Sequence, residues 1–427
     1  MSFMRVYNKG MTELEISKNI LLKVAEEKVP FATVLKMTFK KLNLDNTQKS
    51  NIAALVGCEL RHQYLFDNLI TRYLGDVSFQ DTIFLRFALA NHMFLRRYDE
   101  AKFLEKAYET ASKENIKDLL DFVDSTEEII PANLDKASPE FLALRYNTPA
   151  WVIRMWQKQY GKGAVFKTLK VNYRPSIPSL RLDPSKVNID EFLSKHPDYV
   201  KAPVDDIVIY QGHGNVKTLP ELKEGSAFFM KMGTKYALDK LDLDPIKGIG
   251  VFCEIPNNVI QDLIVRFGKD LHLDLIVNHT YLYTELKRFV ENKGLTHSYV
   301  YESEVSGLIT CLSKKVHTFL CMPRNTTFDL FRSTPDYFLR VEQNKLDEII
   351  ASENAALEEC SKFVEDGGEL VYLIPTLSRK ESNNVIANFL VNHKDFKLVE
   401  EMQLFPFEVY DSCLYFARLQ KVETESD

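Results

Sequence analysis

The chain has 427 residues, a formal net charge of −6, 45% hydrophobic and 27% charged residues, which is ordinary globular usage with length enough for two or three hydrophobic cores. Its six cysteines are scattered without a C-x-x-C pair, which argues against a disulfide framework and a zinc site. No leader and no apolar run of membrane length is present, so we expect a cytoplasmic protein without a metal and without a membrane partner.

Residues 1–134 are predicted to form an all-helical domain of five or six helices. Apolar residues such as Ile16 and Ile20 recur at helical intervals. Thr12 followed by Glu15 has the spacing of a helix N-cap. Periodicity alone indicates only a helical bundle.

The next region carries a basic stretch. From Trp151 to Lys186, eight basic residues are accompanied by a single acid, Asp183. Basic side chains near phosphates set the affinity and the salt dependence of RNA binding, so we favour RNA contact over a merely solvated helix face. The interleaved aromatic residues either stack on bases or form a helix core, and we favour the core. The candidate RNA-binding residues are Arg145, Arg154, Lys158, Lys162, Lys167, Lys170 and Arg174.

The last part of the chain is predicted to form a Rossmann-like parallel sheet. Apolar runs alternate there with helical stretches such as Asn344–Val364. The candidate strands are Gly248–Val251, Leu273–Val277, Ser298–Tyr301, Val316–Leu320 and Leu370–Leu373, completed by strands around Leu398–Glu401 and Cys413–Leu419.

Two segments in this part resemble the catalytic loops of RNA cytosine-C5 methyltransferases. GGELVYLIPTLSRKESNNVIANFL, from Gly367, resembles the strand that carries a catalytic cysteine, and Pro375 stands in the place of that cysteine. TFLCMPRNTTFDLFRSTPD, from Thr318, resembles the DAPCSG loop, with Cys321 for its aspartate and Arg324 for its cysteine. Proline and arginine offer no nucleophile. The resemblance therefore implies common ancestry together with a loss of chemistry.

A third segment resembles the loop that binds S-adenosylmethionine in this family. In IGVFCEIPNNVI, which corresponds to VLDLCAAPGGKT, Cys253 and Pro256 are retained and Asn257 replaces a glycine. Asn278 stands where the family has an acid for the cofactor's ribose. The resemblance implies that these four residues and Cys321 are a remnant of a cofactor pocket. No cofactor is expected unless this pocket still binds S-adenosylmethionine.

The order of the segments resembles the Fmu/Sun family of rRNA cytosine-C5 methyltransferases. SPEFLALRYNTPAWVIRMWQKQYG, from Ser138, is similar to the family's entry sequence, and Leu169–Asn172 to its LRVN strand. The resemblance implies a NusB-like domain over 1–134, a small RRM-like α/β connector over 135–243 and a Rossmann-like methyltransferase domain over 244–427. It also implies RNA, in particular ribosomal RNA, as a partner, with a ribosomal or transcription protein as another.

The chemistry of the family decides between three interpretations. Cytosine C5 becomes nucleophilic only after a thiolate adds at C6, and Arg324 and Pro375 leave no thiol at either family position. We therefore predict an RNA-binding, catalytically inactive member of the family. The alternatives are an active S-adenosylmethionine-dependent RNA methyltransferase with relocated groups, and a protein-binding scaffold. Cys321 could be a relocated nucleophile, but lone cysteines are more often small buried hydrophobes.

Overall fold

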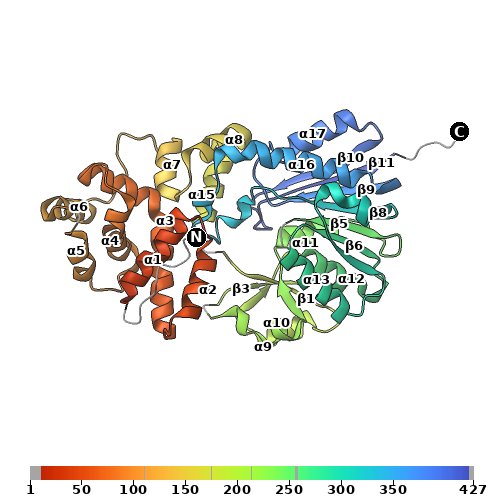
Figure 1. Ribbon diagram of the computed structural model, residues 1–427, viewed down its shortest axis with the longest axis horizontal. Coiled ribbons are helices and arrows are strands. Elements are labelled where there is room, and N and C mark those ends of the chain that lie inside the picture. Colours follow the sequence, from red (N-terminus) through yellow and green to blue (C-terminus); the bar gives the residue numbers. More distant parts are fainter. Residues whose placement is uncertain (1–10, 110, 175, 213, 255–257, 423–427) are drawn as a thin grey trace. The chain divides into compact units, whose positions relative to one another are not determined.

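The computed structural model describes residues 11–422, except 110, 175, 213 and 255–257 (Figure 1). The chain forms two compact units, and a late segment of the chain belongs to the first of them. The first unit is Met1–Arg174 with Leu330–Gln343, and the second is Pro175–Asp329 with Asn344–Asp427. The division into three domains remains a prediction.

The first unit is entirely helical in its described residues, as expected for the N-terminal region. Thr12 caps the first helix as predicted, since its hydroxyl accepts a hydrogen bond from the Glu15 N–H at 3.3 Å and the Glu15 carboxylate accepts one from the Thr12 N–H at 2.8 Å. The helices are α1 (Glu13–Glu26), α2 (Phe31–Lys41), α3 (Asn46–Leu74), α4 (Phe79–Ala90), a π-helix η1 (Asn91–Leu95), α5 (Ala101–Ala107), α6 (Lys113–Ser125), α7 (Pro139–Tyr146), α8 (Ala150–Asn172) and the short α15 (Tyr337–Arg340).

The 29-residue helix α3 is the centre of this unit and contacts α1, α4, α6 and α7. Its residues Leu55, Phe66 and Leu69 are buried, as is Ile20 of α1. Burying such side chains stabilises a fold by about 2 kcal/mol each, which explains why this helix is largely apolar on its buried face between Ile52 and Ile70.

The segment Leu330–Gln343 is attached to the helical unit by polar contacts to its backbone. The buried Asp336 carboxylate accepts a hydrogen bond from the Phe31 N–H at 3.1 Å, at the start of α2. Arg332 Nε donates to the Arg174 carbonyl at 3.2 Å, at the end of α8. A carboxylate at a helix start and a guanidinium at a helix end both complement the helix dipole.

The second unit begins with a small four-stranded antiparallel sheet of βαββαβ topology and spatial order β2-β3-β1-β4. This is the expected RRM-like fold. However, the prediction of a strand at Leu169–Asn172 is wrong, because these residues form the last turn of α8 and continue its helical pattern of burial. The elements are β1 (Ser179–Leu182), α9 (Ile189–Lys195), β2 (Tyr199–Lys201), β3 (Ile207–Tyr210), the 3₁₀ helix η2 (Val216–Thr218), α10 (Pro220–Glu224) and β4 (Ala227–Phe229).

Both faces of the small sheet are covered. Leu180 and Val208 lie in a core with Phe192 of α9. On the other face, Ile207 belongs to the core of the larger sheet, with Ile209 and Phe228 packed against it. The small sheet is therefore an integral layer of the second unit.

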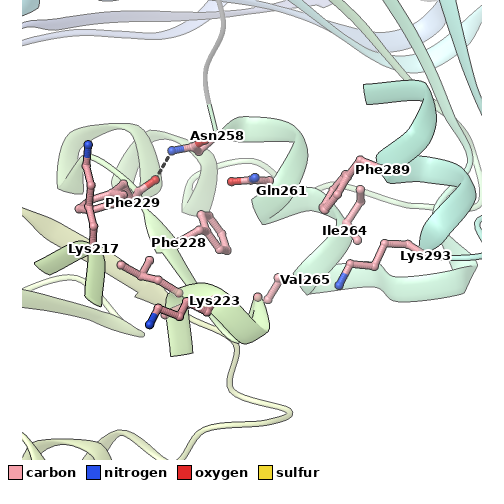
Figure 2. A pocket seen from close by; sticks show the side chains of 13 residues that line it. Lys217, Lys223, Phe228, Phe229, Asn258, Gln261, Ile264, Val265, Phe289 and Lys293 are labelled. Carbon is pink, nitrogen blue, oxygen red and sulfur yellow. Dashed lines mark hydrogen bonds between the residues drawn. The ribbon is translucent and has the colours of Figure 1, made fainter. Parts of the chain in front are cut away.

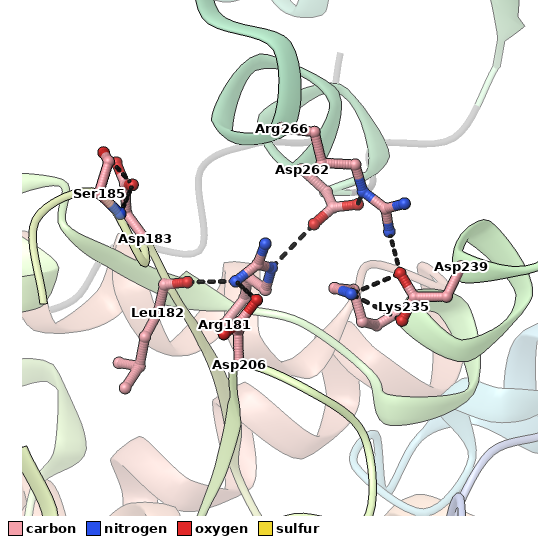
Figure 3. Close-up of polar contacts among 9 residues, drawn as sticks. All are labelled: Arg181, Leu182, Asp183, Ser185, Asp206, Lys235, Asp239, Asp262 and Arg266. Carbon is pink, nitrogen blue, oxygen red and sulfur yellow. Dashed lines mark hydrogen bonds and ion pairs between the residues drawn. The ribbon is translucent and has the colours of Figure 1, made fainter. Parts of the chain in front are cut away.

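A buried ion network joins the small sheet to the helices of the large one (Figure 3). Arg181 Nε lies 2.9 Å from Asp262 Oδ1 and its guanidinium 3.0 Å from Asp206. Asp262, on α12 (Val259–Phe267), also binds Arg266, which in turn binds Asp239 at 2.6 Å on α11 (Met232–Asp239). Within this network each charge lies against one of opposite sign, which a buried ion requires.

The large sheet has seven strands in the order β10-β11-β9-β8-β5-β6-β7, with the five from β9 to β7 parallel and β11 antiparallel to both neighbours. It is a Rossmann-like sheet, as expected. Its strands are β5 (Ile249–Cys253), β6 (Leu273–Val277), β7 (Ser298–Glu302), β8 (Val316–Met322), β9 (Val364–Ile374), β10 (Phe396–Leu404) and β11 (Leu414–Lys421).

Helices cover both faces of this sheet (Figure 1). Val251 packs on the side of α11, α12 and α13 (Thr280–Asn292), and Phe252 packs on the side of α14 (Leu308–Cys311), α16 (Leu346–Ser361) and α17 (Asn383–Asn392). Successive residues of a strand face opposite sides, so a strand buried on both faces must be continuously apolar. In the described part of the chain no helix is both long and apolar enough to cross a membrane.

Candidate functional site

The carboxyl ends of β5, β6, β8 and β9 meet at one edge of the large sheet, where ligands bind in such folds. Cys253, Asn278, Arg324 and Pro375 all lie at this edge, at or just after the ends of these strands. The predicted pocket residues Pro256 and Asn257 lie outside the described residues. The edge is therefore the candidate site, defined by the residues that follow these four strands.

Glu254 holds the ends of three strands together. Its carboxylate accepts one hydrogen bond from Asn278 Nδ2 at 2.5 Å and another from the Arg324 N–H at 2.8 Å, and its own N–H donates to the Met322 carbonyl at 3.1 Å. The sequence reasoning missed this residue, although a charged side chain at the end of an apolar strand was a signal for it. The amide of Asn278 is thus directed at a protein carboxylate on the neighbouring strand.

No accessible thiol was found among the described residues of this edge. The Cys253 and Cys321 side chains are 1% and 0% exposed, and they point into the cores on opposite faces of the sheet. Cys321 lies beside Cys360 of α16, and burial raises the pKa of the Cys360 thiol well above its usual value. Arg324 is exposed and Pro375 is half-buried at the two positions that the family gives to cysteine.

The loops after β8 and β9 are clamped by a buried carboxyl group. Glu381 accepts hydrogen bonds from the Thr326 N–H at 2.7 Å, from the Thr326 hydroxyl at 2.9 Å and from the Thr376 hydroxyl at 2.8 Å. Burial raises the pKa of Glu381, and the hydrogen bonds from the two threonines act in the opposite direction. The clamp determines the path of both loops without using the side chain of Arg324 or Pro375.

The seven candidate RNA-binding residues lie in the helical unit, on α7, on α8 and just after it, and all seven are exposed. Arg154 forms an ion pair with Glu140 at 2.6 Å. The helix α8 is kinked at Gly161, whose φ of 82° and ψ of 159° are open to glycine and closed to other residues. Of the interleaved aromatic residues, Trp156 is buried as predicted, whereas Tyr173 is 41% exposed.

A groove of about 410 Å³ lies between β4 of the small sheet and the helices α12 and α13 (Figure 2). Phe228, Phe229 and Phe289 form apolar parts of its lining. The lysines Lys217 and Lys293 also line it, together with Lys223 and no carboxylate. The groove therefore suits an anionic ligand with apolar parts, and the sequence reasoning did not find it.

The described residues do not provide a metal site. Across the ranges that the structure describes, no group of three or more His, Cys, Asp or Glu residues is placed to hold an ion.

No protein-family model matches the chain. A Bacillus subtilis protein named "Probable ribosomal RNA small subunit methyltransferase B" is 20% identical over 404 residues, which cover 90% of this chain and 89% of that protein. The crystal structure of a protein called PH0851 superposes with a TM-score of 0.74 at 18% identity, covering 97% of this chain and all of that one. A methyltransferase homologue from Pyrococcus horikoshii gives a TM-score of 0.57 at 13% identity, covering 68% of this chain and all of that one.

Proposed function

We propose that this chain, which is homologous to proteins named ribosomal RNA small subunit methyltransferase B, is a cytoplasmic RNA-binding protein that has lost cytosine-C5 methyl transfer. The observation that carries this proposal is the edge of the large sheet. Arg324 and Pro375 occupy the ends of β8 and β9, and both nearby cysteines, Cys253 and Cys321, have their side chains buried. A nucleophile must reach the substrate, so a thiol enclosed in a core cannot add to a base.

The cofactor side of the edge supports the same proposal. A bound S-adenosylmethionine would supply the methyl group, and its ribose hydroxyls would need an acceptor at the end of β6. Asn278 places an amide there, and that amide already donates to Glu254. The residues present do not fit the expected pattern of a free acid at this position, so no step of a reaction is assigned to them.

RNA binding is supported by exposed basic residues on α7 and α8. They include Lys158 and Lys162 on either side of the kink at Gly161. Lysine and arginine release counterions when they meet phosphates, which makes such binding depend steeply on salt. Ribosomal RNA is the first partner to test, because it appears in the name of the sequence relative.

The test uses the full chain and small-subunit ribosomal RNA. We expect RNA retention that weakens steeply between about 50 mM and 200 mM salt, and no transfer of labelled methyl from S-adenosylmethionine. Replacing both Lys158 and Lys162 by glutamine should lower the slope of log affinity against log salt by about 1 to 2. The control is Lys113→Gln with Lys117→Gln, two exposed lysines at the same spacing on α6.

Two results would contradict the proposal. The first is RNA binding that is absent or independent of salt. The second is methyl transfer to RNA by the unmodified chain, and loss of that transfer in Cys321→Ser would establish a relocated nucleophile.

A further inference from the structure

The covered faces of the small sheet leave a question about where RNA bases could stack. RRM domains stack bases on aromatic residues of their open sheet face. Here that sheet is buried on both sides, with Ile207 enclosed on one face and Val208 on the other. Across the strands of this sheet the one exposed aromatic side chain is Phe229 of β4, at 37%, so the sheet presents no open row of rings.

The helical unit presents a row of five neighbouring aromatic rings. Phe94 of η1 stacks on His62 of α3, with centroids 3.7 Å apart and planes 7° apart. His62 contacts Tyr173 at 5.6 Å, Tyr173 contacts Tyr146 at 5.8 Å, and Tyr146 contacts Phe166 at 6.2 Å. We call this set, Phe94, His62, Tyr173, Tyr146 and Phe166, the ring row.

Three members of the ring row are open to solvent. Phe94, Phe166 and Tyr173 are 41%, 48% and 41% exposed. A cleft of about 280 Å³ adjoins the row, lined by Phe94, Tyr146 and Tyr173 together with Phe331 and Pro335. Exposed apolar side chains that form a contiguous patch mark interaction sites, whereas exposed apolar residues that occur singly are normal.

The turn between α7 and α8, next to Tyr146, is anchored to α3. Asn147, in a left-handed conformation with φ of 48°, donates from Nδ2 to the Leu60 carbonyl at 2.8 Å and accepts from the Tyr64 N–H at 3.1 Å. Tyr173 and His62 share a hydrogen bond of 3.1 Å. These bonds anchor the turn after Tyr146 and orient Tyr173 against His62, which reduces the entropic cost of binding at these rings.

Basic residues adjoin members of the ring row along the chain, and Arg61 lines its cleft. Arg145 precedes Tyr146, Lys167 follows Phe166, and Arg174 follows Tyr173, and all three basic side chains are exposed. Burial, together with the neighbouring Arg61 guanidinium, lowers the pKa of His62 to about 3, so that this ring is neutral at pH 7. Flat neutral faces flanked by cations match the bases and phosphates of a single strand.

We infer that the ring row and its cleft bind single-stranded RNA, with bases stacked on the open rings and phosphates against the flanking basic residues. This inference rests on the proposed RNA-binding function and adds the strandedness of the ligand and the place where it binds. Stacking on aromatic rings depends little on sequence, so the site should accept different bases.

The test measures the fluorescence anisotropy of a labelled short single-stranded RNA of mixed sequence with the full chain. Phe166→Ala and Tyr173→Ala should each weaken binding about tenfold, with an unchanged salt slope, because they remove stacking and leave the charges. Tyr173→Phe, which keeps the ring, should bind like the parent. The matched control is Tyr281→Ala, since Tyr281 is 66% exposed on α13 of the other unit.

Photocrosslinking of 4-thiouridine RNA to the unmodified chain provides a second measurement that needs no variant. Adducts at Phe166 or Tyr173 support the site, and adducts confined to the second unit overturn it. Parent-like affinity in both alanine variants also overturns the ring-row site and would leave the cleft for a protein segment. In that case, salt-dependent RNA binding through Lys158 and Lys162 would still uphold the proposed function. An unmodified chain that binds no RNA overturns both.

Discussion

Asn278 donates a hydrogen bond of 2.5 Å to Glu254, so that an amide and a carboxylate pair between the carboxyl ends of β5 and β6. The resemblance expects an acid at position 278 and a small residue at position 254. The carboxylate at this edge therefore stands at the end of β5 instead of the end of β6.

This pair predicts how cofactor binding can be improved. Glu254→Ala combined with Asn278→Asp should raise the affinity for S-adenosylmethionine at least about tenfold, because hydrogen bonds to a charged group contribute about 1.5–3 kcal/mol. Isothermal titration calorimetry with the full chain measures this. Asn278→Asp alone is the control and should give no gain, since it sets two carboxylates against each other. An unmodified chain that already binds as tightly as the double variant would show that Glu254 serves the cofactor itself.

The ion network of Figure 3 predicts a large loss of stability from one substitution. Arg181→Leu should lower the free energy of unfolding by about 3 kcal/mol, because it leaves the fully buried Asp262 with a single cationic partner. Arg154→Leu, which breaks an exposed ion pair with Glu140, should cost under about 1 kcal/mol. Urea denaturation followed by circular dichroism gives both values. Equal costs would mean that the network contributes no more than a surface pair.

Two nearby glycines give a matched test of backbone strain. Gly161→Ala should destabilise the chain by about 2 kcal/mol, because alanine is strained at the φ and ψ of this kink. Gly163→Ala should be neutral or stabilising by about 0.5–1 kcal/mol, because Gly163 is helical and a Cβ there meets open space. Thermal melts of the two variants compare them directly. Loss of stability in Gly163→Ala as large as in Gly161→Ala would contradict the kink.

Glu353 predicts a pH dependence of stability. Its pKa is raised to about 11, first by burial and then by the neighbouring Glu381, so the folded chain keeps this carboxyl protonated where the unfolded chain releases the proton. Stability from this group is therefore full below the unfolded pKa near 4.5 and falls as pH rises toward 11. Each pH unit in that window costs up to about 1.4 kcal/mol.

Glu353→Gln removes this titration and keeps the shape of the side chain. We expect the variant to unfold at a higher temperature than the parent at about pH 8.5 and to differ little from it at about pH 5. The control, Glu348→Gln, changes an exposed carboxyl on the same helix. The same pH profile in the parent and in Glu353→Gln would rule out this group as the source.

Much of the large sheet could be predicted from the sequence because its strands are buried on both faces and read as apolar runs. Leu273–Val277 coincides with β6, and Val316–Leu320 lies within β8. The strand expected at Leu169–Asn172 failed because four letters that resemble a family strand also continue a helical repeat. Local patterns cannot decide between the two, since tertiary packing overrides propensity.

Two features of the site depended on contacts that no local pattern contains. Glu254 was not predicted because it replaces an alanine of the family motif, and only the reactive positions of that motif indicated site residues. The ring row unites residues from α3, η1, α7 and α8, which only folding brings together. The NusB-like assignment and the role of each site residue remain predictions.

The Glu381 clamp has a consequence for how such a chain evolves. Because the clamp uses hydroxyl groups, a backbone N–H and one carboxyl, the path of these loops does not depend on the side chains at positions 324 and 375. Selection for a folded chain alone would therefore not preserve a thiol at either position.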